Sequence, residues 1–256
     1  MNALILAAGY ATRLYPLTQS FPKPLLQIGS KSIIDYIIKG LHKISELKNI
    51  WVVTNHTFFR HFQDWRKSHS DKTKVEIVDD GTQTPEDRLG AVRDMDFVIQ
   101  KEKINSDLLV VGGDNLFEFD LRNFAVQGQS HKPYPTMGVY DVGSKTIAKR
   151  FGVVTLDSKG KVAHFVEKPI HPHSTLVAMC LYYFPKESLP WIRCYLDSGE
   201  NADAPGHYLS WLAREESVYG YLFEGDWVDI GDLKVYKETQ SRYSQKESKK
   251  GVKDNG

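Results

Sequence analysis

The chain has 256 residues, of which 25% are charged and 41% hydrophobic, the balance of a globular protein long enough for one large core. Its formal net charge of +1 excludes a general electrostatic affinity for nucleic acid or for an acidic membrane surface, so a positive field that binds a ligand must be local. No apolar run approaches the roughly 18 to 20 residues of a membrane span. Because the chain opens on an apolar strand, we expect no targeting peptide. Cys180 and Cys194 are typical of reduced thiols in a cytoplasmic protein.

An apolar strand over residues 3–7 runs directly into a loop of small residues, 8–12. The backbone N–H groups of such a loop can approach an anion closely, because few side chains stand in the way. Arg13 and Lys23 add two cations, and prolines on both sides of the lysine restrict its backbone. Many α/β proteins contain a similar turn, and neither a dinucleotide fingerprint nor a Walker loop is present. The restricted cations nevertheless favour a polyphosphate ligand.

Alternating strand and helix patterns follow in the first half of the chain. Ser32 and Asp35 have the spacing of a capping box, and apolar residues behind them repeat at helical spacing. The strand patterns over 50–53 and 108–111 are apolar throughout, which is typical of a parallel sheet covered by helices on both faces. We therefore expect a Rossmann-like, three-layer α/β fold with a mostly parallel sheet. The further elements expected here are strands over 50–53, 75–78 and 108–111 and helices over 58–65 and 89–99.

The second half adds antiparallel strands. Residues 157–160 give a turn signal between two strand patterns, which predicts a β-hairpin added to the parallel core. No linker divides residues 1–240, so we expect a single domain there, followed by a polar, disordered tail over 241–256. The other elements expected here are strands over 136–140, 151–156, 162–166, 175–184 and 218–223, a helix over 204–214 and a closing helix that begins near Asp232.

Two aspartates stand where a metal ion could bind. Asp114 follows the strand over 108–111, and ligands of open α/β sheets bind outside the carboxyl ends of the strands, here beside the loop around Gly9. Asp229 precedes the turn into the closing helix. Carboxylates from separate strand ends suit Mg²⁺, which takes few protein ligands and retains water or phosphate oxygens. Each aspartate could instead cap a turn or a helix, but their occurrence together with Arg13 favours the metal site.

Residues 8–18 and 22–25 resemble the G-x-G-T-R-L-x-P-x-T and P-K-P signature of sugar-1-phosphate nucleotidyltransferases, the NDP-sugar pyrophosphorylases that include glucose-1-phosphate thymidylyltransferase. Residues 113–117 are similar to the G-D-N-[IL]-F of these enzymes, and residues 227–231 to their W-x-D-[TI]-G. The chain departs from the signature at Ala11, where the family has its second glycine. Alanine disfavours a left-handed backbone, so we expect a slightly different turn.

The resemblance implies roles for further residues. Residues 150–154 and 165–169 resemble the [RY]-[FY]-G-V and E-E-K-P elements that bind the sugar phosphate, although Glu167 and Lys168 could by composition be a solvated ion pair. The segment that contacts the nucleobase keeps Gly90 but lacks the glutamine of thymidylyltransferases, so the resemblance does not decide which nucleobase the protein uses. The implied roles are catalytic for Arg13, Lys23 and Lys168, nucleotide-binding for Leu6, Ala7, Ala8, Gly9, Thr12, Gly90 and Asp114, substrate-binding for Asn115, Gly152, Glu167, Lys168 and Ala178, and magnesium-binding for Asp114 and Asp229.

The resemblance implies a Mg²⁺-dependent transfer of a nucleotide from a nucleoside triphosphate to a sugar 1-phosphate, with release of pyrophosphate. Arg13 would hold the leaving pyrophosphate, while Lys23 and Lys168 would neutralise the phosphates that meet. Two other functions stay open on the same fold: a cytidylyltransferase for a phosphocholine- or phosphonate-type acceptor, and a non-catalytic subunit that senses a sugar nucleotide. The expected partners are small molecules, with neither nucleic acid nor membrane, and a homo-oligomer is compatible with the sequence.

Overall fold

A mixed sheet of nine strands carries the core of the molecule. The computed structural model describes residues 1–69 and 74–253. The parallel part of the sheet runs in the order β6 (Leu108–Gly112), β1 (Asn2–Leu6), β4 (Asn49–Thr54) and β5 (Lys74–Asp79). The carboxyl ends of these strands therefore meet along one edge of the sheet, where the sequence predicted a ligand.

Antiparallel strands extend the sheet beyond β6. The long strand β11 (Leu176–Phe184) pairs with β6, and β8 (Thr136–Asp141) pairs with β11. The expected hairpin consists of β9 (Gly152–Leu156) and β10 (Val162–Glu167), and β12 (Tyr219–Phe223) lies parallel to β8. The prediction of an α/β fold with a mostly parallel core and added hairpins is confirmed.

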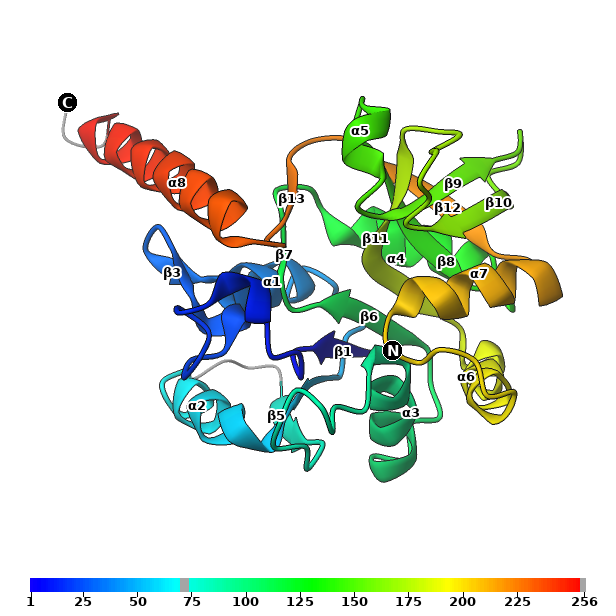
Figure 1. Cartoon of the computed structure of the whole chain (residues 1–256), viewed down its shortest axis with the longest axis horizontal. Coiled ribbons are helices and arrows are strands. Elements are labelled where there is room, and N and C mark those ends of the chain that lie inside the picture. The colour runs from blue at the N-terminus through cyan, green and yellow to red at the C-terminus, as the bar shows by residue number, and fades with distance from the viewer. Residues whose placement is uncertain (70–73, 254–256) are drawn as a thin grey trace.

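Helices cover both faces of the sheet, which gives three layers (Figure 1). One face carries α1 (Ile33–Leu41), α2 (His56–Lys67) and α4 (Leu121–Ser130). The other carries α3 (Ala91–Lys101), α6 (Pro190–Asp197) and α7 (Pro205–Glu215). The shorter elements are the strands β2 (Gln27–Ile28) and β3 (Lys31–Ser32), the helix α5 (Lys145–Ala148) and the 3₁₀ turns Thr12–Leu14, Lys23–Leu25 and Lys186–Ser188.

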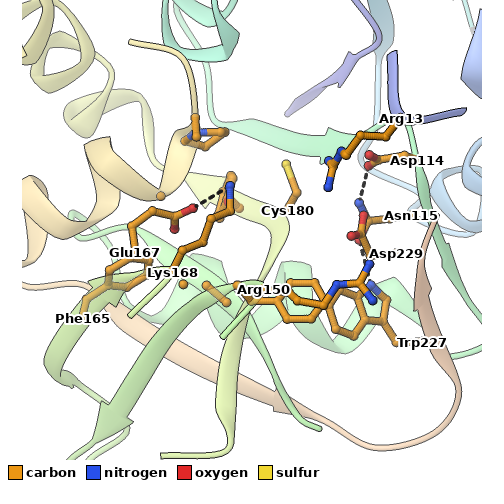
Figure 2. Close-up of a pocket in the computed structure, with 17 residues that line it drawn as sticks. Arg13, Asp114, Asn115, Arg150, Phe165, Glu167, Lys168, Cys180, Trp227 and Asp229 are labelled. Atoms are coloured by element: carbon orange, nitrogen blue, oxygen red, sulfur yellow. Dashed lines mark hydrogen bonds and ion pairs between the residues drawn. The ribbon is translucent and has the colours of Figure 1, made fainter. Parts of the chain in front are cut away.

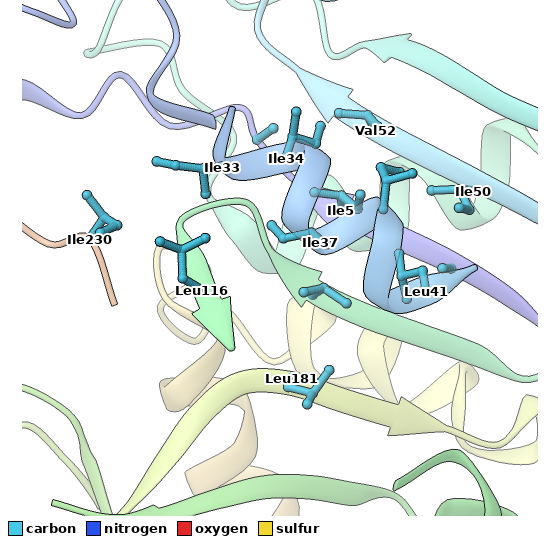
Figure 3. Packing of buried hydrophobic residues seen from close by; sticks show 14 of the residues in the cluster. Ile5, Ile33, Ile34, Ile37, Leu41, Ile50, Val52, Leu116, Leu181 and Ile230 are labelled. Atoms are coloured by element: carbon cyan, nitrogen blue, oxygen red, sulfur yellow. The ribbon is translucent and has the colours of Figure 1, made fainter. Parts of the chain in front are cut away.

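The alternation of side chains along β1 explains why its sequence is apolar without interruption. Ala3 and Ile5 belong to the cluster under α1, whereas Leu4 belongs to the cluster under α3. Figure 3 shows the isoleucines of α1 packed against Ile5 and against residues of β4. The first turn of α1 has the predicted capping box, in which the Ser32 amide donates to Asp35 Oδ2 at 2.9 Å.

The closing helix α8 (Leu233–Lys253) continues past the point where the sequence predicted a disordered tail. The expectation of a disordered tail is therefore wrong for residues 241–253, which are helical, while residues 254–256 lie outside the described residues. Tyr243 is only 7% exposed, and its ring lies edge-on to Tyr36 with centroids 5.3 Å apart. Lys246 donates to Glu118 at 2.8 Å. These contacts dock α8 on the body, and the single domain over 1–240 stays a prediction.

None of the helices in the described part of the chain has the length and apolar character that crossing a lipid bilayer requires.

Replacement of Tyr243 by alanine tests whether the end of α8 is docked. Loss of this buried ring should lower the free energy of unfolding by roughly 2–4 kcal/mol, as for other large-to-small core changes. The exposed neighbour provides the control, because Ser244→Ala should change stability by less than about 0.5 kcal/mol. Urea unfolding of both variants measures the difference, and equal midpoints would show that the helix end is not part of the folded core.

Candidate active site

Two short strands join distant parts of the chain at the carboxyl edge of the sheet. β7 (Asn115–Phe117) follows β6, and β13 (Trp227–Asp229) pairs with it antiparallel, so that Asp229 lies opposite Asn115. The carboxylates of Asp114 and Asp229 thereby reach the same cavity (Figure 2). The convergence of the two acids agrees with the sequence analysis, although neither strand was foreseen.

Lys23 lies beneath these acids rather than in the open cleft. Its Nζ donates to Asp114 Oδ2 at 2.6 Å and to the carbonyl oxygen of Ile230 at 3.0 Å, and the side chain is 11% exposed. The Ile230 amide in turn donates to the Asp114 carbonyl at 3.0 Å. The lysine therefore ties the two acid-bearing segments together, a contact that the sequence did not reveal.

The two carboxyl groups respond differently to this environment. Burial raises the pKa of Asp229 to about 7, and the negative charge of Asp114 adds to this effect, while Lys23 and Arg13 oppose it. Burial also raises the pKa of Asp114, but the charge and hydrogen bond of Lys23 outweigh it and hold the pKa below its ordinary value. The site therefore contains one ionised acid and one acid that ionises only against repulsion.

The chemistry of these two acids suits a hard divalent cation. The Asp229 carboxylate accepts no hydrogen bond from the described residues, so its lone pairs are free for a ligand. In residues 1–69 and 74–253 no group of three or more His, Cys, Asp or Glu side chains could hold a metal. An ion at Asp114 and Asp229 would have two protein ligands and would take its other oxygens from water or substrate, which is the habit of Mg²⁺.

The larger of two adjoining cavities lies over the small-residue loop and has a volume of about 600 Å³. Ala7 is absent from its wall, because its side chain is buried and its amide donates to the Val53 carbonyl. Gly90 has φ +87°, and a side chain there would lie 2.7 Å from the Ala202 carbonyl oxygen. The other predicted nucleotide-binding residues in the wall are Leu6, Ala8, Gly9, Thr12, Gly90 and Asp114.

Ala11 departs from the expected behaviour of alanine. We expected the alanine to change the turn, but it adopts φ 48° and ψ 43°, the left-handed conformation that glycine favours. Its carbonyl accepts hydrogen bonds from the Leu14 amide at 2.9 Å and from Thr18 Oγ1 at 2.8 Å. These contacts hold the strained residue in place, at a cost of about 1–2 kcal/mol for the conformation.

The smaller cavity, about 180 Å³, brings together the residues assigned to the second substrate. Glu167 is held close to two glycines, since a Cβ on Gly152 or on Gly206 would lie 2.9 or 1.9 Å from its Oε2. Lys168 Nζ lies 3.4 Å from Glu167 Oε1, and the lysine side chain is 60% exposed. Arg13 and Asp114 belong to the walls of both cavities, so they stand at the junction. The remaining predicted substrate residues in this wall are Asn115, Gly152 and Ala178.

Sequence reasoning missed several side chains in these walls. Arg150 lines the smaller cavity and donates to Asp232 at 2.9 Å, although it stands in a quoted motif and could have been assigned. Asp80 and Asp94 line the larger cavity. The only signal for Asp94 in the sequence was its position among apolar residues of the helix, and an acid in a first helical turn also interacts favourably with the helix dipole. Cys180 lines both cavities as a free thiol.

Comparison with known families agrees with this geometry. Residues 2–246 match the family model described as nucleotidyl transferase. The chain belongs to the nucleotidyl transferase family. The bifunctional protein GlmU of Methanococcus aeolicus is 29% identical over 234 residues, and that of Methanocaldococcus jannaschii is 29% identical over 233 residues. Each match covers 90% of this chain but 51% of the relative, so the chain spans about half the length of these curated relatives.

Solved structures share the fold of this nucleotidyl transferase. A Bacillus anthracis protein described as a glucose-1-phosphate thymidylyltransferase, in complex with sucrose, superposes with a TM-score of 0.81 at 19% identity and covers 95% of both chains. A UDP-glucose pyrophosphorylase complexed with UDP-glucose gives a TM-score of 0.79 at 19% identity, over 96% of this chain and 98% of the other.

Glycine at position 11 should stabilise this nucleotidyl transferase. Ala11→Gly removes the strain of the left-handed conformation but also increases the conformational entropy of the unfolded chain. We expect the free energy of unfolding to rise by up to about 1 kcal/mol in total. Ala8→Gly is the matched control, because Ala8 has no positive φ and the change should cost about 0.5–1 kcal/mol. Equal losses of stability in the two variants, measured by urea unfolding, would contradict the left-handed assignment.

Removal of the Asp229 charge should stabilise the metal-free protein at high pH. The pKa of Asp229 is raised in the folded state from 3.8 to about 7, so the folded protein binds more protons than the unfolded protein within this window. Stability contributed by this group is therefore lost as pH rises through the window. We expect Asp229→Asn to raise the Tm at pH 8 and to have a smaller effect at pH 5.

Asp232→Asn is the control with the opposite sign. Hydrogen bonds from backbone amides, the Val235 amide first, lower the pKa of Asp232, so its loss should reduce the Tm at pH 8. Thermal unfolding in the presence of a chelator measures both variants. An Asp229→Asn effect that is independent of pH would contradict the strained carboxyl pair.

Proposed function

We propose that this nucleotidyl transferase forms an NDP-sugar and pyrophosphate from a nucleoside triphosphate and a sugar 1-phosphate, with Mg²⁺ as cofactor. The observation that carries the proposal is the convergence of Asp114 and Asp229 at the junction of two cavities. The larger has an amide-rich loop for a triphosphate, and the smaller has Glu167 and Lys168 for a sugar phosphate. Structural neighbours named as a glucose-1-phosphate thymidylyltransferase and a UDP-glucose pyrophosphorylase support it.

The reaction needs positioning and charge neutralisation rather than a general base. The attacking oxygen of a sugar phosphate is already an anion. It forms a bond to the α-phosphorus while the bond between the α-phosphorus and the bridging oxygen of the β-phosphate breaks, and the electron pair of that bond leaves with pyrophosphate. Repulsion between the two polyanions is the main obstacle. Arg13, at the junction of the cavities, can hold the leaving pyrophosphate with two N–H donors, and Lys168 can neutralise the incoming phosphate.

Asp114 and Asp229 are the residues that would hold Mg²⁺, which supplies positive charge to phosphate oxygens when bound. Lys23 keeps Asp114 ionised and oriented through its 2.6 Å hydrogen bond. Asn115 Nδ2 donates to Asp114 Oδ1 at 2.9 Å, and Trp227 Nε1 donates to Asn115 Oδ1 at 2.7 Å. The chain of donors fixes the carboxylate before any ligand arrives, so little reorganisation remains for the reaction.

Glu167 supplies an acceptor for sugar hydroxyl groups. Its carboxylate lies against Gly152 and Gly206, which carry no side chain to cover it, and it borders the smaller cavity. A ligand with adjacent hydroxyls and a phosphate could replace the ion pair between these residues, with its hydroxyls on Glu167 and its phosphate on Lys168. Lys168 favours a ligand that carries a phosphate, while the aromatic residues Phe151, Phe165, Tyr182 and Trp227 in the same wall keep a phosphocholine-type acceptor as the alternative to be tested.

Pyrophosphate release tests the proposal directly. The full chain, a panel of nucleoside triphosphates and several sugar 1-phosphates should give pyrophosphate only when Mg²⁺ is present. Asp114→Asn should lower kcat/KM by about 1,000-fold or more, because loss of metal-held charge costs several kcal/mol in the transition state.

Asp226→Asn is the matched control for that variant. This acid stands three residues before Asp229 but pairs with Lys246 and Arg242 at the surface, so its turnover should stay within about twofold of wild type. Wild-type-like activity of Asp114→Asn would reject the metal assignment. Turnover of a nucleoside triphosphate with phosphocholine but with none of the sugar 1-phosphates would support the cytidylyltransferase alternative. Nucleotide binding without any turnover would support the sensor alternative.

A further inference from the structure

Two acids in the larger cavity have no part in the phosphate chemistry. Asp80 follows β5, and Asp94 lies in the first turns of α3. β1 and β4 lie between β5 and β6 in the sheet. Asp80 therefore stands about three strand spacings, roughly 14 Å, from β6, the strand that Asp114 follows. A nucleotide with its phosphates at Asp114 extends over that order of length. The acid pair therefore lies where the base of a bound nucleotide would end.

Asp94 is buried and incompletely satisfied. It is 6% exposed, and its Oδ1 has no hydrogen-bond partner within the described residues, although it borders the cavity. A buried acceptor of this kind costs free energy unless a ligand completes it. The side chain is therefore a recognition element and not only a part of the helix.

The two acids interact with each other electrostatically. Burial raises the pKa of Asp94 to about 8, and the charge of Asp80 and a side-chain hydrogen bond between the two acids add to this. Burial also raises the pKa of Asp80, an effect that hydrogen bonds from Thr82 oppose, and the Thr82 amide and Oγ1 donate to Asp80 Oδ1 at 2.7 and 2.8 Å. Since the hydrogen bond between the acids engages the proton of the pair, the oxygens left for a ligand, Asp94 Oδ1 among them, are acceptors.

The bases differ in how they meet two adjacent acceptors. Uracil and thymine offer one N–H between two carbonyl oxygens, which the acids would repel. Adenine and cytosine offer an amino group next to an unprotonated ring nitrogen, so one contact of each is also repulsive. Guanine alone presents two adjacent donors, N1–H and the 2-amino group. The Gly90 amide, which borders the cavity and has no acceptor among the described residues, can donate to the guanine carbonyl oxygen.

A cation in the wall of this cavity, Arg88, does not alter that conclusion. Arg88 Nε donates to Asp203 Oδ1 at 2.9 Å, and its Nη1 donates to the Pro85 carbonyl at 2.7 Å. Its charge is therefore engaged by Asp203 on the wall of the same cavity.

We propose that Asp80 and Asp94 bind the N1–H and 2-amino edge of guanine, so that this protein uses GTP in preference to the other nucleoside triphosphates. The inference rests on the nucleotidyl transfer proposed above and names its nucleotide substrate.

Comparison of the nucleoside triphosphates as substrates tests the base preference, and replacement of an acid by its amide tests the role of the acids. Wild-type kcat/KM, measured as pyrophosphate release with the sugar 1-phosphate that supports turnover, should be roughly 10-fold or more higher for GTP than for UTP, dTTP, CTP or ATP. Asp94→Asn presents one donor and one acceptor, the pattern that complements uracil and thymine. This variant should lower the GTP to UTP ratio by roughly 10-fold or more.

Asp96→Asn is the matched control on the same helix. Asp96 is also buried, but its carboxylate accepts from Arg193 Nη1 at 2.6 Å and does not border the cavity, so the base ratio should stay within about twofold of wild type. Asp80→Asn, which keeps the acceptor for Thr82, repeats the test if Asp94→Asn does not fold.

The outcomes separate this inference from the proposed function. Best turnover with any base other than guanine, or a GTP to UTP ratio that neither amide variant changes, overturns the inference while the transferase function stands. Absence of pyrophosphate release with every nucleotide and sugar phosphate rejects the proposed function, and calorimetric binding of GTP against UTP then decides the base preference by itself.

Discussion

The ladder between β7 and β13 is the constraint on which the site depends. It joins segments more than 100 residues apart in the chain and sets Asp229 opposite Asn115, next to Asp114. Two carboxylates would not approach each other without compensation, and Lys23 provides it by bonding both to Asp114 and to the backbone at Ile230. Burial, and after it the charge of Asp114, raises the pKa of Asp229 although Lys23 and Arg13 oppose both effects. A folded site with this residual repulsion is prepared for a cation.

Unfavourable local features gather around the same cleft. Ala11 and Lys168 have positive φ values, and Asp94 has a buried oxygen without a partner in the described residues. Each of these features lowers stability, and each borders one of the two cavities or adjoins the loop that does. Buried polar atoms without a partner in the described residues also occur in the core, at Trp51 Nε1 and Tyr208 Oη, and Lys103 has a positive φ outside the walls of both cavities. What distinguishes the cleft is that an unpartnered carboxylate oxygen and two strained residues lie there beside space for a ligand.

The sequence predicted the elements whose signals are local. The capping box at Ser32, the uniformly apolar strands and the position of Asp114 at a strand end all follow from short-range rules. α8 was underestimated because residues 241–248 are almost wholly polar, and the one ring that docks them, Tyr243, carries no periodic signal. The β7–β13 pairing and the contact of Lys23 with Asp114 depend on segments brought together only by the complete fold, so no window of sequence contains them.

The shared wall of the two cavities couples their ligands electrostatically. Arg13 and Asp114 border both spaces, so a group bound in one changes the charge that faces the other. A triphosphate entering alone would bring its negative charges toward Asp114 and Asp229, with Arg13 as the cation at the junction. On the proposed function, this balance favours entry of the nucleotide together with its divalent ion. The sugar phosphate would then meet a site in which the divalent ion offsets the charge of the two carboxylates, and Lys168 at the open side of the smaller cavity would guide it in.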